Sequence, residues 1–225
     1  MKITINVHIY LNDNEIPRVD KTKFLGVYVD SKLSWKYHIA EVEKKVSKNT
    51  GIIRKFAYFL PVNIQRILYC TLILPYLSYC NIVWGNTFES NLKRLRVYQN
   101  HIIRHLCNVR NVRPGGIRTD TLFNELKLLR LKDITDFQLG LFMYKCTHNL
   151  LPDHLCHLFE KNSEHHKYET RSSPLIHIPK HKKILFQHTV RFSGPKIWNS
   201  LSPDLKAVPS LNLFKQHYKS SFFLK

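Results

Sequence analysis

The strongest constraint on the fold is the helical spacing of apolar residues in two long stretches, 35–60 and 88–107. In the first stretch these residues are Ile39, Val42, Val46, Ile53, Ala57 and Leu60. In the second, the stripe consists of Leu92, Leu95, Gln99, Ile103 and Leu106. Residues three or four positions apart share one face of a helix. Ser34 and Thr87 are placed to cap the two helices, and Pro61 to end the first. The sequence therefore predicts two long amphipathic helices that each bury one face.

Basic residues gather on the helix faces that point away from these apolar stripes. They are Lys44, Lys48 and Lys55 in the first stretch, and Lys93, Arg94 and Arg104 in the second. The chain holds 35 Lys and Arg against 16 Asp and Glu, a formal net charge of +19, which points to a polyanionic partner. Residues 31–60 carry +5 and residues 61–118 carry +7. We expect the six residues to contact nucleic-acid phosphates, although a solvated basic surface explains the composition alone equally well.

The N-terminal region has the pattern of β-structure. Apolar and polar residues alternate over residues 2–10, and Asn12, Asp13 and Asn14 then supply turn residues, which predicts a hairpin. The stretch Phe24 to Val29 predicts another strand. Gly26 interrupts that strand, so we expect a bulge or a close backbone approach there.

The rest of the chain is predicted to be helical with a basic end. We expect helices at 62–74 and 76–84 separated by Pro75, and further helices at 121–129, 134–147, 153–159 and 211–223. Residues 160–183 are predicted as an exposed basic linker and 184–192 as a strand. The predicted fold is α+β and mainly α, with an N-terminal β-hairpin and strand (1–33), a helical bundle (34–118), a helical scaffold (119–159) and a basic C-terminal extension (160–225).

Three groups of residues carry a resemblance to a known family. The first is Lys23-Phe24-Leu25-Gly26-Val27-Tyr28-Val29-Asp30, followed by Leu33, Trp35 and His38-Ile39. The second is Leu60-Pro61, Leu68-Tyr69, Leu74-Pro75-Tyr76-Leu77 and Val83-Trp84-Gly85, and the third is Gln99 with Ile103-Arg104. A fainter likeness continues through Leu151-Pro152, Tyr168-Glu169-Thr170-Arg171 and Trp198-Asn199-Ser200-Leu201. In their order and spacing these residues resemble the reverse transcriptases of jockey-like non-LTR retrotransposons.

The resemblance implies a role for each part of the chain. Residues 1–33 would correspond to the end of the palm, and residues 34–118 to the thumb that grips the template-primer duplex. The remainder would be a C-terminal extension. The partner implied is RNA or an RNA/DNA duplex, bound without sequence preference. A palm hairpin without neighbouring strands also predicts self-association through its unpaired edge.

The residues that such a polymerase uses for catalysis are not found in this sequence. Polymerisation needs two magnesium ions held by clustered carboxylates, and no Asp-Asp pair occurs here. Asp30 is the one carboxylate on the palm-like segment, and we expect it to serve as a cap or turn residue. We therefore assign no catalytic residue and no cofactor, and expect a truncated remnant that binds nucleic acid. Two alternatives stay open: part of an active enzyme whose N-terminal half is missing, or a non-functional product.

Other chemistry has weaker support. The possible zinc ligands Cys146, His148, His154, Cys156 and His157 have spacing that fits poorly. The aromatic residues Tyr58, Phe59, Tyr76, Tyr79, Trp84 and Tyr98 are expected to be buried rather than to stack on bases. The charge-free stretch between Arg66 and Glu89 predicts a kinked, buried helix pair and not a membrane span. Five cysteines without a CxxC motif suggest reduced thiols in an intracellular protein, in the nucleus or the cytoplasm.

Overall fold

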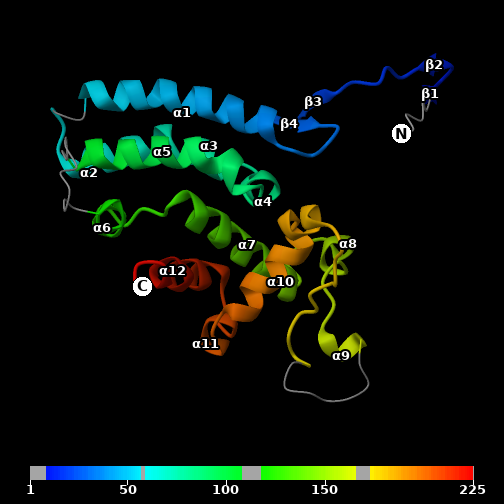
Figure 1. Ribbon diagram of the computed structural model, residues 1–225. Coiled ribbons are helices and arrows are strands. Elements are labelled where there is room, and N and C mark those ends of the chain that lie inside the picture. Colours follow the sequence, from blue (N-terminus) through cyan, green and yellow to red (C-terminus); the bar gives the residue numbers. More distant parts are fainter. Residues whose placement is uncertain (1–8, 57–58, 108–117, 166–172, 225) are drawn as a thin grey trace.

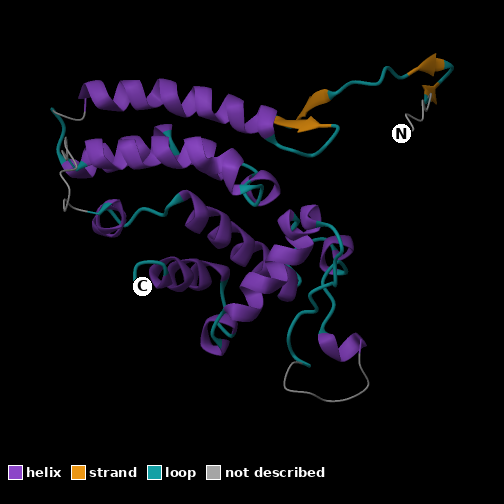
Figure 2. Cartoon of the chain, in the orientation of Figure 1, coloured by secondary structure: helices purple, strands orange, loops and turns teal. Residues whose placement is uncertain are grey.

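The computed structural model describes residues 9–56, 59–107, 118–165 and 173–224. Helices dominate, and strands occur only near the N-terminus of the described chain (Figure 2). The first group of elements is β1 (Tyr10–Leu11), β2 (Asn14–Glu15), β3 (Lys21–Phe24), β4 (Val27–Asp30), α1 (Lys36–Phe56), α2 (Val62–Leu72), α3 (Leu74–Ser78), α4 (Asn81–Trp84) and α5 (Glu89–Leu106). The second is α6 (Thr119–Glu125), α7 (Leu131–Thr147), α8 (Asp153–Cys156), α9 (Asn162–His165), the 3₁₀-helix η1 (Ile184–His188), α10 (Val190–Ser200), α11 (Pro203–Lys206) and α12 (Leu211–Ser221). The predicted mainly helical α+β class is confirmed.

Two antiparallel hairpins form the N-terminal part. The predicted turn after the first strand is confirmed, because Asn12 and Asp13 adopt φ angles of 49° and 63° between β1 and β2. Most of the predicted first strand, residues 2–8, lies outside the described residues. The apolar side chains of Tyr10 and Leu11 are exposed.

The prediction of one strand from Phe24 to Val29 is wrong. Phe24 pairs with Val27 across a turn in which Leu25 and Gly26 have φ angles of 44° and 83°, so two strands meet there. The predicted close approach at Gly26 is confirmed. A Cβ on Gly26 would lie 3.4 Å from the ring of Tyr79, whose hydroxyl donates a 2.6 Å hydrogen bond to the Leu25 carbonyl.

The two long helices bury most of the stripes that their spacing predicts. The predicted end of the first helix at Pro61 is wrong, because α1 runs to Phe56 and Pro61 is the N-cap of α2; Ala57 lies outside the described residues and Leu60 lies beyond α1. On α1, Ile39, Val42, Val46 and Ile53 are buried, and on α5 the whole predicted stripe is buried, Gln99 included. Ser34 lies at the start of α1, where its Oγ accepts a 3.5 Å hydrogen bond from the Lys36 N–H. Thr87 does not cap α5: the cap position is Phe88, and the Thr87 hydroxyl instead accepts a hydrogen bond from the Asn91 side chain.

The helix pair after residue 61 breaks twice. The first break is at Ile73, two residues before Pro75, which sits in the first turn of α3 as proline prefers. The second break, which we did not predict, is at Cys80 with a left-handed φ of 49°. It turns α4 so that Trp84 is fully buried and its indole N–H donates to the Tyr79 carbonyl over 2.9 Å.

A second layer of helices is built around α7 (Figure 1). Helices α10 and α12 pack on α7. The ring of Tyr144 stacks on Phe214 with centroids 4.5 Å apart, and its hydroxyl donates to the Val208 carbonyl over 2.8 Å. Gly140 lets α12 approach, since a Cβ there would overlap the ring of Tyr218. The predicted helix 211–223 is confirmed as α12.

The predicted strand over 184–192 is wrong. Residues 184–188 form η1 and α10 follows directly. This segment forms hydrogen bonds with the connection before α5 and not with a strand. His188 Nδ1 lies 2.6 Å from the Asn86 carbonyl oxygen, and the Asn86 side-chain amide donates to the Gln187 carbonyl. The predicted linker 160–183 is also held in part, because the Asn199 side chain bonds both the N–H and the carbonyl of Ile176.

A buried glutamine joins the two layers. The Gln99 amide nitrogen donates to the Tyr69 hydroxyl over 2.7 Å and to the Leu129 carbonyl over 3.0 Å. Its carbonyl oxygen accepts from the Leu131 N–H over 2.8 Å. Gln99 is 1% exposed, so its hydrogen bonds have no competition from bulk water. One side chain of α5 thereby fixes α2 and the start of α7.

We predict that Gln99→Leu destabilises the protein by about 2–4 kcal/mol, because the buried Leu131 N–H and Leu129 carbonyl lose their partner. Urea unfolding followed by circular dichroism measures the loss. Gln216→Leu, on the exposed side of α12, is the matched control and should be nearly neutral. Equal stability of the two variants would contradict the assigned role of Gln99.

A buried histidine makes stability depend on pH. His38 is 5% exposed, lies edge-on to Trp84, and has no hydrogen-bond partner for either ring nitrogen among the described residues. Burial, aided by the charge of Lys45, lowers the pKa of His38 below its ordinary value of 6.5. As the pH falls, His38 therefore binds a proton more readily in the unfolded chain than in the folded protein.

We predict that stability falls as pH drops below about 6.5, with a contribution from His38 of at most about 1.4 kcal/mol per pH unit. His38→Phe keeps an aromatic ring beside Trp84 and should flatten this part of the profile. The exposed His217→Gln is the control and should leave the slope unchanged. Thermal melts between pH 7.5 and 5 test this, and an unchanged slope in His38→Phe would refute it.

Candidate nucleic-acid interface

Helices α1 and α5 lie side by side and run in the same direction (Figure 1). Near their N-terminal ends, the Asn91 side chain donates a 3.1 Å hydrogen bond to the Ser34 carbonyl. Further along the pair, Arg94 Nη1 lies 3.5 Å from Glu43 Oε2. Because their buried stripes face the core, the opposite faces of both helices remain available to solvent.

An open groove separates the exposed faces of the two helices. It is lined by Ala40, Glu43, Lys44, Ser47 and Lys48 of α1 and by Arg94 and Tyr98 of α5. We call it the α1/α5 groove. Three of the six basic residues predicted from sequence, Lys44, Lys48 and Arg94, are thus brought together.

Two of these three cations already have acidic neighbours. Lys44 Nζ lies 2.6 Å from Glu41 Oε1, which raises the pKa of Lys44, and Arg94 pairs with Glu43. Both basic side chains are more than 70% exposed, so these pairs are weak and a phosphate can compete for the cations. Lys48 is exposed and has no ion pair within the part of the chain that the structure describes. It is therefore the groove cation most readily available to a phosphate.

The other three predicted residues lie elsewhere. Lys55 is exposed on the same face of α1 as Lys48, two turns further along. Lys93 is exposed but lies about 100° around α5 from Arg94, outside the groove. Arg104 is half-buried, and its guanidinium donates to the Thr119 hydroxyl over 2.9 and 3.2 Å. Its contact joins α5 to α6.

The sequence analysis did not select two residues that flank the buried stripes, Arg54 on α1 and Tyr98 on α5. Burial lowers the pKa of His105 of α5, and the nearby charge of Arg54 of α1 lowers it further. Tyr98, which we expected in the core, is half-buried and lines the groove. Both residues lie between the apolar and the opposite face of their helix. The sequence alone does not give the direction of α5 relative to α1, and this direction decides which residues the flanking side chains contact.

Asp30 has a structural role, as expected. Its carboxylate accepts hydrogen bonds from the backbone N–H groups of Lys32, Ser34 and Trp35 at 3.0–3.1 Å, and from the Ser34 hydroxyl. Burial alone raises the pKa of Asp30, but these hydrogen bonds outweigh burial and hold the pKa below its usual value. The carboxylate therefore organises the turn into α1.

The cysteine and histidine residues near 146–157 make contacts of their own. The Cys146 thiol donates to the Cys156 carbonyl, and His148 stacks on Tyr144 with centroids 3.9 Å apart. Among the described residues, no three His, Cys, Asp or Glu side chains are grouped so that they hold a metal ion. Within the same residues, no helix has both the length and the apolar character needed to cross a membrane.

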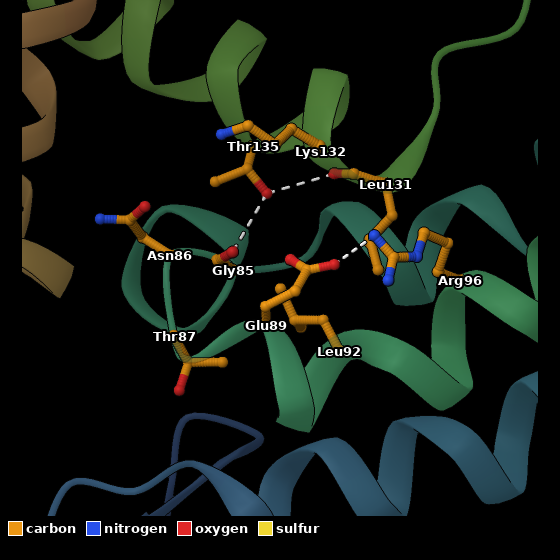
Figure 3. Close-up of a pocket in the computed structure, with 9 residues that line it drawn as sticks. All are labelled: Gly85, Asn86, Thr87, Glu89, Leu92, Arg96, Leu131, Lys132 and Thr135. Carbon is orange, nitrogen blue, oxygen red and sulfur yellow. Dashed lines mark hydrogen bonds and ion pairs between the residues drawn. The ribbon is translucent and has the colours of Figure 1, made fainter.

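A small cavity lies where the two layers meet near the start of α5 (Figure 3). The Thr135 hydroxyl donates to the Gly85 and Leu131 carbonyls, while Glu89 and Arg96 form an ion pair beside it. The cavity holds about 70 Å³ and is lined by charges of both signs. It is therefore a packing junction between layers, and both of its cations are already ion-paired, Arg96 with Glu89 and Lys132 with Asp136.

Comparison with known proteins gives two similar chains, both from Drosophila melanogaster. A probable RNA-directed DNA polymerase from transposon X-element is 24% identical over 129 residues. The RNA-directed DNA polymerase from mobile element jockey is 27% identical over 132 residues. Each match covers 56% of this chain and 14% of the polymerase. No family model and no solved structure matches. The two similarities confirm the resemblance that the motifs carry, and they indicate the family of RNA-directed DNA polymerases from non-LTR retrotransposons.

Proposed function

We propose that this chain binds RNA or an RNA/DNA duplex through its phosphates, without sequence preference, along the α1/α5 groove. The observation that carries the proposal is the convergence of Lys44, Lys48 and Arg94 on one groove. Lys55 and Arg54 extend the basic surface along α1. A row of cations along two helices suits a regular row of phosphates.

The composition of the two helices supports a phosphate-directed interaction. Helix α1 holds six Lys and Arg against two Glu, and α5 holds four against one. Lysine and arginine contacts to phosphate fix position and affinity but carry no base information. The names of the two similar proteins favour nucleic acid over other polyanions, since an RNA-directed DNA polymerase acts on RNA and DNA.

The same proposal includes the absence of polymerase activity from these 225 residues alone. No two Asp residues are adjacent in them, and Asp30 is occupied by the turn before α1. Two-metal catalysis needs carboxylates that are free to hold both ions. A second candidate function is a nucleic-acid-gripping part of a longer, active polymerase. The match to only 14% of two such polymerases favours this candidate.

We predict that binding of an RNA/DNA duplex weakens steeply with salt and that replacing groove cations reduces the salt slope. Neutralising one phosphate-binding cation should lower the slope of log K against log salt by about one. Lys48→Gln with Lys55→Gln should have the largest effect, since neither cation is ion-paired among the described residues. Lys44→Gln and Arg94→Gln should have smaller effects on the slope, because each of these cations is already partly neutralised by its Glu partner. Fluorescence anisotropy at several salt concentrations measures the slopes.

The matched control replaces Lys180, Lys182 and Lys183, which lie far along the chain from both helices. These changes remove more charge than the Lys48/Lys55 pair but should reduce the slope less. Lys93→Gln, outside the groove, is a second control on α5 itself. If affinity follows total charge whichever residues are replaced, the groove assignment is wrong.

We predict that the purified chain incorporates no nucleotide on a primed RNA template with magnesium or manganese. The assay needs Asp30→Asn as a companion. If Asp30 has only a structural role, this change lowers stability by about 1 kcal/mol, because a neutral amide oxygen accepts the hydrogen bonds of the turn N–H groups less strongly than a carboxylate does. Incorporation by the wild-type chain that disappears in a folded Asp30→Asn variant would overturn the proposal.

A further inference from the structure

An apolar pocket lies between the two helical layers, away from the α1/α5 groove. It is lined by Tyr69 of α2 and Leu74 of α3, and by Leu128, Ile134 and Phe137 before and within the start of α7. Its volume of about 270 Å³ approaches the lower end of small-molecule sites, roughly 300–1,000 Å³. The pocket therefore has the size and the surface to hold a compact apolar group.

Three cations from distant parts of the chain line this pocket. They are Arg66 of α2, Lys127 in the turn after α6 and Lys219 of α12, and no Asp or Glu among the described residues lines the pocket with them. The Arg66 Nε donates a 2.9 Å hydrogen bond to the Leu126 carbonyl, which holds the guanidinium in place. Across the described ranges, neither its terminal nitrogens nor the two lysine ammonium groups form an ion pair or a hydrogen bond.

We propose that this pocket binds a small molecule that combines an apolar ring system or chain with one anionic group. The half-buried side chains of Leu74 and Phe137 gain by being removed from water, at roughly 25 cal/mol per Å² of covered surface. The unpaired cations attract the anionic group and orient it. A bare phosphate would leave the apolar walls uncovered, and a nucleic-acid duplex is too large to enter. The inference goes beyond the proposed function, since none of these cations lines the groove.

The test uses two dyes that share the same rings and differ in charge. The full chain is titrated with 1-anilinonaphthalene-8-sulfonate and with uncharged N-phenyl-1-naphthylamine, and fluorescence enhancement is measured. The sulfonate should saturate a single site, and the neutral dye should bind at least roughly threefold more weakly because it lacks the ion pair. A sulfonate that fills many equivalent sites, or a neutral dye that binds as tightly, would overturn the proposal.

Variants locate the site. Lys219→Gln should weaken sulfonate binding roughly threefold and leave the neutral dye unchanged. Lys215→Gln, an exposed position on the same helix outside the pocket, is the matched control. Cys70→Phe fills the pocket and should remove binding of both dyes, with circular dichroism to verify folding. If that variant does not fold, the Lys219 and Lys215 variants decide alone: equal loss in both shows general charge attraction and refutes the site.

Discussion

The structure depends on the hydrogen bonds of one buried amide. Gln99 belongs to the apolar stripe of α5, yet it bonds the Tyr69 hydroxyl and the backbone at Leu129 and Leu131. Its placement fixes the register between the first layer and α7, because the amide satisfies groups that would otherwise be buried without partners. Helices α10 and α12 then pack on α7. The second layer is thus positioned by a residue of the first.

The basic surface follows from the same core. Once Val42 and Val46 face inward, helical geometry sends Lys44 and Lys48 outward, and the packing of α5 against α1 adds Arg94 from the neighbouring helix. Glu41 and Glu43 moderate this surface by pairing with two of the cations. The groove is consequently basic without being uniformly so, and its unpaired charge is concentrated at Lys48 and towards Lys55.

Sequence reasoning succeeded where periodicity is strong and failed where tertiary contacts decide. The stripes of α1 and α5 were predictable because burial repeats with the helical period. The strand expected at 184–192 is helical, and its contacts with Asn86, through the Gln187 carbonyl and the His188 ring, join parts of the chain that no local pattern brings together. Arg104 was counted with the exposed cations because nothing in the sequence places Thr119 beside it. The α1/α5 groove itself was beyond sequence alone, as it depends on the relative direction of two helices.

The parallel direction of α1 and α5 has an electrostatic consequence. Each helix carries a dipole equivalent to roughly half a positive charge at its N-terminus and half a negative charge at its C-terminus. Because both N-termini lie at one end of the groove, the two dipoles add there to the charge of the side chains. At the other end, Arg54, Lys55 and Arg104 are partly offset by two helix C-termini. The helix dipoles therefore make the electrostatic potential more positive at the N-terminal end of the helix pair and less positive at the C-terminal end. A polyanion lying along the pair is attracted unequally at its two ends.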